Sequence, residues 1–125
     1  MKTLKIVIVD DDEDLLEELS EILASEGCAV EPMSDSLAAA SAIRQSQPDL
    51  VLLDVRMRGK DGFEVAAELA GEPETADIPI IVMSGFYTSE ERGALEKIPG
   101  VQEVLLKPFS CEDVISRVDA LRRRR

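Results

Sequence analysis

Residues 6–12 read IVIVDDD and decide the fold class, because a run of four β-branched residues ends directly in three aspartates. Continuous apolar runs of this length, without alternation of polar and apolar residues, are typical of strands buried on both faces of a parallel sheet. Four further runs follow at residues 29–30, 50–53, 80–83 and 104–106, the first of them weaker than the others. The sequence therefore predicts five short parallel strands.

Between these runs, apolar residues recur at helical spacing. The stripes contain Leu15, Leu16, Leu19, Ile22 and Leu23; Leu37, Ala40 and Ile43; Phe63, Ala66 and Leu69; and Val114, Ile115, Val118 and Leu121. Thr88 and Glu91 have the spacing of a capping box and predict one more short helix. Helix caps are expected at Asp12, Asp61 and Ser110. Strands that alternate with helices need right-handed crossovers and helices on both faces, so the predicted fold is a doubly wound (βα)5 α/β sandwich.

The chain is strongly acidic. Its 125 residues, a length that fits one domain, carry 26 acidic and 14 basic side chains and a formal net charge of −12. An acidic body repels nucleic acid and attracts divalent cations or a basic protein surface, so no direct nucleic-acid partner is expected. The chain contains no histidine. This excludes Ser-His-Asp and Cys-His catalysis and leaves no imidazole to accept a phosphoryl group.

Cysteine usage and the lack of targeting signals predict a cytoplasmic protein. Cys28 and Cys111 lie far apart and form no metal-ligand spacing, so both are expected to be reduced thiols. The first apolar run is too short, and too soon followed by aspartates, for a signal peptide. No stretch approaches the roughly 20 apolar residues of a membrane span, and no membrane partner is expected.

Polar side chains follow four of the predicted strands at the point where each strand ends. They are Asp10, Asp11 and Asp12 after the first run, Asp54 after the third, Ser84 after the fourth and Lys107 after the fifth. Taken singly, each has an ordinary explanation as a helix cap, a turn residue or a solvated loop residue. In a doubly wound sheet, however, the carboxyl ends of the strands meet at one edge, and ligands bind there.

Together these residues predict a phosphoryl-transfer site. At least two carboxylates would lie close together, which is unfavourable unless a cation or a proton relieves the repulsion. Oxygen ligands without histidine or cysteine suit Mg²⁺. A carboxylate would attack the phosphorus, Mg²⁺ and Lys107 would neutralise the oxygens, and Ser84 would donate a hydrogen bond to one of them.

Five short motifs, in their order and spacing, resemble the receiver (response-regulator) domain of bacterial two-component signalling. They lie at residues 9–11, 53–57, 60–62, 78–85 and 106–109, and the resemblance covers essentially the whole chain. It implies a flavodoxin-like fold whose five-stranded parallel sheet has the order 2-1-3-4-5. It also implies that Asp54 accepts a phosphoryl group from a histidine kinase or histidine phosphotransfer protein, and that the chain is not an enzyme with a separate substrate.

The same resemblance implies two groups of site residues. The Mg²⁺ ligands would be Asp11, Asp54 and the backbone carbonyl of Arg56, with Asp10 acting through water. The contacts to the phosphoryl oxygens would be Ser84 and Lys107, and the Lys107–Pro108 peptide bond would be cis. Phosphorylation would switch the binding of a downstream protein through the face made by the fourth helix, fifth strand and fifth helix. Whether phosphorylation also drives the formation of a homodimer stays an open question.

Four positions depart from the usual pattern of that family. Arg58 stands where proline is usual, which predicts a looser loop. Ser84 keeps the hydroxyl of the commoner threonine, and Gly85 replaces the usual alanine, which predicts a more mobile backbone. Val104 replaces the tyrosine or phenylalanine that swings inward on activation. The chemistry of the site is thus expected to be intact, whereas the usual aromatic readout is not.

Two aromatic residues after the fourth run could substitute for that readout. Phe86 and Tyr87 either take it over or merely cover the core, and both readings stay open. In receivers, the residues two beyond the phosphoacceptor and two beyond the hydroxyl, here Arg56 and Phe86, flank the path of an attacking water. Neither side chain can act as a base to orient that water, so a long-lived phospho-aspartate is predicted.

Two other functions share parts of this pattern. A phosphatase of the haloacid-dehalogenase class also uses an aspartate nucleophile, but it needs a second carboxylate two residues later, where this chain has Arg56. The alternative is a degenerate receiver that binds its partner without phosphorylation. It stays open because Arg58 and Val104 depart from the usual pattern of the family. Residues 1–121 are expected to form the receiver domain, and residues 122–125, all arginine, a basic tail or linker stub. The chain is expected to be a stand-alone receiver or an excised domain.

Overall fold

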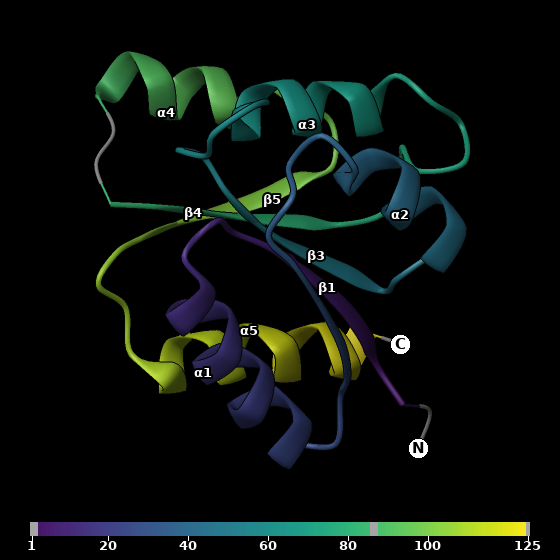
Figure 1. Ribbon diagram of the computed structural model, residues 1–125, viewed down its shortest axis with the longest axis vertical. Helices are drawn as coiled ribbons and strands as arrows, with labels where there is room; N and C mark the ends of the chain where they lie inside the picture. Colours follow the sequence, from purple (N-terminus) through teal and green to yellow (C-terminus); the bar gives the residue numbers. More distant parts are fainter. Residues whose placement is uncertain (1–2, 86–87, 125) are drawn as a thin grey trace.

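Strands and helices alternate throughout the computed structural model, which describes residues 3–85 and 88–124 (Figure 1). The strands are β1 (Lys5–Val9), β2 (Ala29–Met33), β3 (Leu50–Asp54), β4 (Ile80–Ser84) and β5 (Val101–Leu106). The helices are α1 (Glu13–Ser25), α2 (Ala39–Ser46), α3 (Gly62–Ala70), α4 (Ser89–Glu96) and α5 (Cys111–Arg124). None of the helices in these described ranges has both the length and the apolar character needed to cross a membrane.

All strands lie parallel in one sheet of order β2-β1-β3-β4-β5, as predicted. The central strands β3 and β4 are buried over their whole length, which explains their continuous apolar runs. β2 is half exposed at the edge of the sheet and contains Pro32, which an edge strand tolerates because one side needs no donor. Its edge position explains why its apolar run was the weakest.

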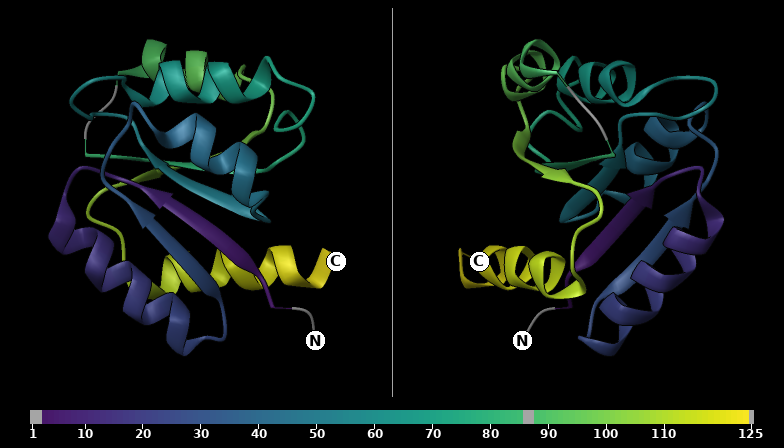
Figure 2. Two further views of the ribbon diagram at one scale, coloured as in Figure 1. Left: turned by 45° about the vertical axis from the view of Figure 1, so that its right-hand side comes forward. Right: turned by 90° about the vertical axis from the view of Figure 1, so that its left-hand side faces the viewer.

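The helices cover both faces of the sheet, so that two separate cores form. Figures 1 and 2 show α1 and α5 on one face and α2, α3 and α4 on the other. Within β1, Ile6 and Ile8 belong to the core beneath α1 and α5, whereas Val7 and Val9 belong to the core beneath the other three helices. Successive strand residues point to opposite faces, and this alternation fills both cores from one strand.

The predicted helix caps are present. The Asp12 side chain accepts a hydrogen bond from the Leu15 amide, and Asp61 and Thr88 each form a capping box. Ser110 and Asp113 exchange the corresponding side-chain and backbone hydrogen bonds at the start of α5. The first N–H groups of a helix have no partner within the helix, and these caps supply one. The caps therefore set the residue at which each of these helices begins.

The prediction that Leu37 belongs to the apolar stripe of the second helix is wrong. Its residue surface is 65% exposed, and α2 begins only at Ala39. The Asp35 carboxylate accepts a hydrogen bond from the Leu37 amide, which closes an Asx turn before the helix. The buried residues of α2 are Ala39, Ala40 and Ile43.

The last helix extends beyond residue 121 and is fastened to the end of α1. One Arg122 nitrogen donates hydrogen bonds to the Glu26 carbonyl and to the Cys28 sulfur, at 2.9 and 3.2 Å. Both Cys28 and Cys111 are free thiols, as expected. α5 itself runs to Arg124. The role of residues 122–125 as a tail or linker stub stays a prediction.

Candidate functional site

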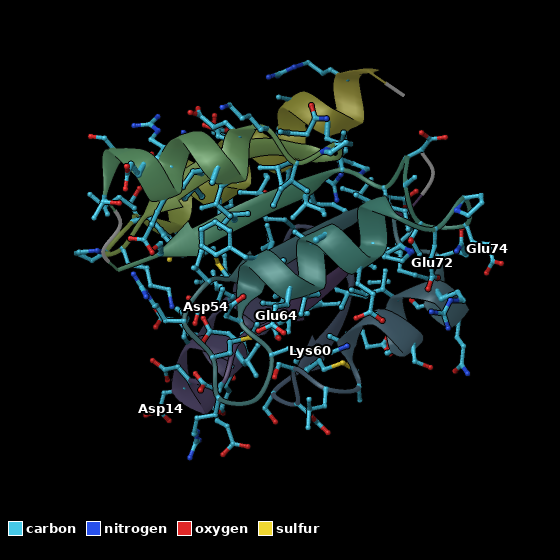
Figure 3. All side chains as sticks on the ribbon, turned by 90° about the horizontal axis from the view of Figure 1, so that it is seen from above. Asp14, Asp54, Lys60, Glu64, Glu72 and Glu74 are labelled. Atoms are coloured by element: carbon cyan, nitrogen blue, oxygen red, sulfur yellow. The ribbon has the colours of Figure 1, made fainter. Side chains whose placement is uncertain are left out.

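The fold brings the predicted site residues to one edge of the sheet. Asp10 directly follows β1, Asp54 and Ser84 are the last residues of β3 and β4, and Lys107 directly follows β5. These four strands are neighbours and run parallel, so their carboxyl ends lie side by side. The Lys107 amide donates a hydrogen bond to the Ser84 carbonyl over 2.6 Å, which joins the ends of β4 and β5. Figure 3 shows Asp54 near the end of α3 that carries Glu64.

Helix α3 packs closely against the strand that carries Asp54. The Gly62 amide donates to the Val55 carbonyl over 2.8 Å. A Cβ atom at Gly62 would lie 2.5 Å from the backbone oxygen of Asp54. Only glycine allows this approach, and the contact fixes the backbone on which the Asp54 carboxylate stands.

Three carboxylates form the centre of the site. Asp10, Asp11 and Asp54 each place one oxygen within 4.8 Å of the others. Asp10 and Asp54 are buried, and Asp11 is partly exposed. Like charges this close repel one another unless a cation relieves them. Clustered carboxylate oxygens are the ligands that suit Mg²⁺, so the residues present fit such an ion.

Lys107 supplies a positive charge inside the cluster. Its Nζ donates to Asp10 Oδ2 over 2.8 Å and lies 3.3 Å from Asp54 Oδ1. Burial by itself would lower the pKa of the Lys107 ammonium, but the hydrogen bond and charge of Asp10, with the charge of Asp54, outweigh it and raise that pKa above its usual value. Lys107 therefore stays protonated and acts as a permanent counter-ion.

One lysine does not compensate three carboxylates. Burial, followed by the charge of Asp10, raises the pKa of the Asp54 carboxyl to about 6, although Lys107 opposes this shift. The second oxygen of Asp10 accepts a hydrogen bond from the Asp12 amide over 2.9 Å. Asp10 thus has protein donors on both oxygens, an arrangement compatible with its predicted indirect role toward the metal.

The loop after β3 contacts the acidic cluster through Arg58. The sequence shows Arg58 only as a residue that stands where the family usually has proline. The Arg58 amide donates to Asp11 Oδ2 over 3.1 Å, and its Nε lies 3.5 Å from the same oxygen. A proline could not make the first of these contacts, because it has no N–H. These contacts tie the loop to Asp11, and the predicted loosening of the loop stays a prediction.

Ser36, from the loop before α2, holds the same segment from the other side. Its buried hydroxyl donates to the Arg58 carbonyl over 2.6 Å and accepts from the Lys60 amide over 3.0 Å. Gly59 has φ = +86° between them, and a Cβ there would lie 2.8 Å from the Ser36 oxygen. The sequence reasoning missed Ser36, because a serine in a loop carries no signal of such a distant contact.

Arg56 connects the site to helix α4. Its guanidinium donates to both carboxylate oxygens of Glu91, at 3.1 and 2.8 Å. From the sequence, Glu91 is expected only as a capping residue, because a helix signature says nothing about a partner 35 residues away. Val104 is buried on β5. Phe86 and Tyr87, the candidates for an alternative readout, lie outside the described residues, so the place of Phe86 beside the path of the attacking water stays a prediction.

The Lys107–Pro108 peptide bond is cis, as predicted. The placement of the site residues therefore agrees with the resemblance, while their assigned roles in binding metal and phosphoryl groups remain proposals.

Comparison with known proteins gives related sequences along nearly the whole chain. A response regulator MprA from Mycobacterium tuberculosis is 37% identical over 123 residues, which are 98% of this chain and 52% of that protein. A response regulator MprA from Mycobacterium avium is 36% identical over 122 residues, again covering 52% of the relative. This chain spans about half the length of the curated relatives it matches.

Solved structures share the architecture. The non-phosphorylated HemR receiver domain from Leptospira biflexa matches with a TM-score of 0.85 and 28% identity, covering 95% of this chain and 94% of that one. Chemotaxis protein CheY4 from Vibrio cholerae has a TM-score of 0.88, covering 96% and 99% of the two chains. At 22% identity, that second likeness shows the fold alone.

The family model of the response regulator receiver domain matches residues 6–119. This match agrees with the prediction that the chain is not an enzyme acting on a separate substrate. The three carboxylates form the acidic cluster that is typical of the Mg²⁺ site of such domains. With the fold, the acidic cluster and the sequence match in agreement, the chain belongs to the response regulator receiver domain family and has its CheY-like α/β fold.

Proposed function

We propose that Asp54 is the phosphoacceptor of a signalling domain and takes its phosphoryl group from a histidine kinase or histidine phosphotransfer protein. The observation that carries the proposal is the placement of Asp54: its side chain, 6% exposed, lies within reach of Lys107 and within 4.8 Å of the Asp10 and Asp11 oxygens. A carboxylate so placed has a cation on one side and further metal-binding oxygens on the other. These 125 residues contain no histidine, so the donor imidazole lies outside them.

Each side chain has a definite task in the transfer. An Asp54 oxygen forms the new bond to phosphorus while the bond from phosphorus to the donor nitrogen breaks and leaves its electron pair on that nitrogen. Lys107 neutralises one phosphoryl oxygen, and Ser84 donates its hydroxyl to another. Asp11, Asp54 and the Arg56 carbonyl would hold Mg²⁺, with Asp10 acting through water; the ion would neutralise the remaining phosphoryl charge.

We assign the output to the face formed by α4, β5 and α5, which would bind a downstream protein or a second copy of this chain. Leu106 supports this assignment, since it lies at the end of β5 beside Lys107 and 54% of its surface is exposed. An exposed leucine next to the site is a suitable contact for a protein partner. The proposal places the protein in the cytoplasm, with residues 1–121 as the receiver and 122–125 as a tail or linker.

The alternative is a receiver that binds its partner without phosphorylation. One observation favours it: Arg58 already occupies an oxygen of Asp11, one of the proposed metal ligands. In this alternative, the Arg58 contact weakens metal binding at Asp11, and Asp54 stays unmodified.

Incubation with a small-molecule acyl phosphate and Mg²⁺ separates the two functions. We expect intact-protein mass spectrometry to show the addition of one phosphoryl group, and peptide mapping to place it on Asp54. Asp54→Asn should abolish the shift. Asp12→Asn is the matched control, because it removes a neighbouring carboxylate and leaves an N-cap residue that serves equally well. A wild-type chain that stays unmodified would favour the alternative.

A further inference from the structure

Arg56 belongs to two structural units at once. Its backbone lies two residues after Asp54, and its carbonyl is the proposed metal ligand. Its side chain crosses from the loop after β3 to helix α4, where one guanidinium nitrogen binds both oxygens of Glu91. The residue is therefore positioned to report a change at the acidic cluster to a helix on the proposed output face.

Glu91 is a structural part of α4 and not an isolated surface acid. Its Oε1 accepts a hydrogen bond from the Thr88 amide over 3.0 Å, and its own amide donates to the Thr88 hydroxyl over 3.1 Å. This reciprocal pair is the capping box that closes the first turn of the helix. The same carboxylate oxygen also accepts from Arg56. The capping box and the ion pair thus share the Glu91 carboxylate, so the loss of Arg56 also changes the capping box.

The rest of α4 is held weakly to the protein. The helix runs only over Ser89–Glu96, and Leu95, near its end, is its buried residue. Its packing is directed at β5. The capping box and Arg56 both hold the first turn. A segment with so few buried apolar contacts opens at low free-energy cost, as movable elements must.

We propose that Arg56 is a positioning residue that couples the phosphorylation state of Asp54 to the first turn of α4. In the unphosphorylated chain, its guanidinium holds Glu91. A phosphoryl group on Asp54 brings about two negative charges and three acceptor oxygens, which bind a guanidinium through charge-assisted hydrogen bonds and compete with the Glu91 carboxylate, whose side chain is 28% exposed. The guanidinium then leaves Glu91, and the first turn of α4 loosens. This inference rests on the proposed function of Asp54.

The coupling supplies a readout that does not need an aromatic ring on β5. Val104 carries no hydroxyl or ring that could move with the site. The Arg56–Glu91 pair instead runs directly from the loop beside Asp54 to α4, over 35 residues of sequence. Exposed ion pairs contribute about 0.2–1 kcal/mol, so their partners exchange readily. Such a weak link can change partners when a stronger anion arrives, whereas a buried pair could not.

Hydrogen exchange of the amides in residues 88–96 tests the coupling. In the wild type, we expect phosphorylation to speed exchange of these amides by about two- to fivefold, the fold-change that corresponds to the loss of one exposed ion pair. Arg56→Gln should exchange faster before phosphorylation and should not respond to it. Arg56→Lys keeps a cation and should retain a reduced response. Glu91→Gln preserves the capping acceptor but should also lose the response.

Glu96→Gln is the matched control, because it removes the same charge from the same helix and breaks an ion pair to Arg92 that lies within α4. It should respond as the wild type does. An Arg56→Gln chain that is phosphorylated and still shows the wild-type response would overturn the proposal. The mass shift measured in the same samples reports whether Asp54 was modified, so a failure of phosphorylation is recognised as a failure of the proposed function.

The unphosphorylated chain provides an independent test. If Arg56 and Glu91 act as one link, the effects of Arg56→Gln and Glu91→Gln on exchange must be non-additive in the double variant. Additive effects would show two unrelated contacts and would overturn the proposal without any reference to phosphorylation.

Discussion

Lys107 and Arg58 both neutralise the acidic cluster, but in contrasting surroundings. The Lys107 side chain is 23% exposed and its two carboxylate partners, Asp10 and Asp54, are 1% and 6% exposed. The Arg58 side chain is 91% exposed, and its partner Asp11 is 25% exposed. Water screens the second pair far more than the first, because charge interactions weaken with the local dielectric. The Lys107 ion pairs therefore stabilise the folded protein, whereas the ion pair of the Arg58 side chain with Asp11 can break at little cost.

This difference in exposure separates a contact that the site must keep, that of Lys107, from one that it can release, that of the Arg58 side chain. Removing one partner of a buried pair leaves an uncompensated charge inside the protein and is costly. An exposed pair is worth little to stability. The site can therefore keep Lys107 in place while a metal ion and a phosphoryl group arrive, and it can give up the Arg58 contact to make room for them.

The largest expected effect is that of Lys107→Met. Asp10 and Asp54 would lose their counter-ion, so we expect the free energy of unfolding at pH 7 without metal to fall by about 3 kcal/mol, the lower end of the cost of breaking a buried pair. Urea denaturation measures it. Lys60→Met is the control: it removes an ion pair to Glu68 in which both side chains are one third exposed, and it should cost less than about 1 kcal/mol. Equal losses in the two variants would contradict the comparison.

Asp54→Asn should have the next largest effect, with opposite sign. The pKa of Asp54 is about 6 in the folded protein, above the usual 3.8. Between these values the folded state binds more protons than the unfolded state, so stability falls as pH rises through this window. Above pH 6 the full penalty is present, roughly 2–3 kcal/mol. Asparagine removes it.

Thermal melts without metal, from pH 4 to pH 8, test this expectation. Asp54→Asn should melt higher than the wild type at pH 8, and most of this advantage should be lost as the pH falls toward 4, near the unfolded-state pKa of 3.8, below which Asp54 is protonated in both states. Asp12→Asn, which changes an exposed capping carboxylate beside the cluster, should show no such pH-dependent gain. A lower melting temperature for Asp54→Asn across the whole range would mean that the carboxylates do not repel one another as the geometry requires.

The sequence predicted the fold and the cluster, because both depend on local patterns. Apart from the weak run in β2, each apolar run ends within one residue of the end of its strand, and a parallel sheet then brings Asp10, Asp54 and Lys107 to one edge whatever the loops do. The contacts of Ser36 and Glu91 could not be predicted in this way. They depend on how two loops and a short helix meet in space, and neither residue differs in type from an ordinary loop serine or helix cap.

Leu37 illustrates the same limit at the level of one turn. Its spacing to Ala40 and Ile43 fits a helix, yet the Asp35 side chain binds the Leu37 amide and delays the start of the helix. A local side-chain hydrogen bond thus overrode the periodicity.

The smallest expected effect concerns Arg58 and the binding of Mg²⁺. The Arg58 amide and guanidinium share Oδ2 of Asp11, a proposed metal ligand, and so compete with the ion for that carboxylate. Arg58→Ala removes only the exposed guanidinium and should tighten binding less than twofold. Arg58→Pro also removes the N–H, and the loss of a hydrogen bond of net value about 0.5–1.5 kcal/mol should then raise the affinity for Mg²⁺ about three- to fivefold.

Calorimetric titration of both variants with Mg²⁺ alone measures these affinities. Arg44→Ala, which removes the same charge from a pair with Glu72 away from the site, controls for net charge and should leave the affinity unchanged. If all three variants bind Mg²⁺ as the wild type does, Arg58 is no competitor for Asp11, and the contrast between the two cations loses its functional meaning.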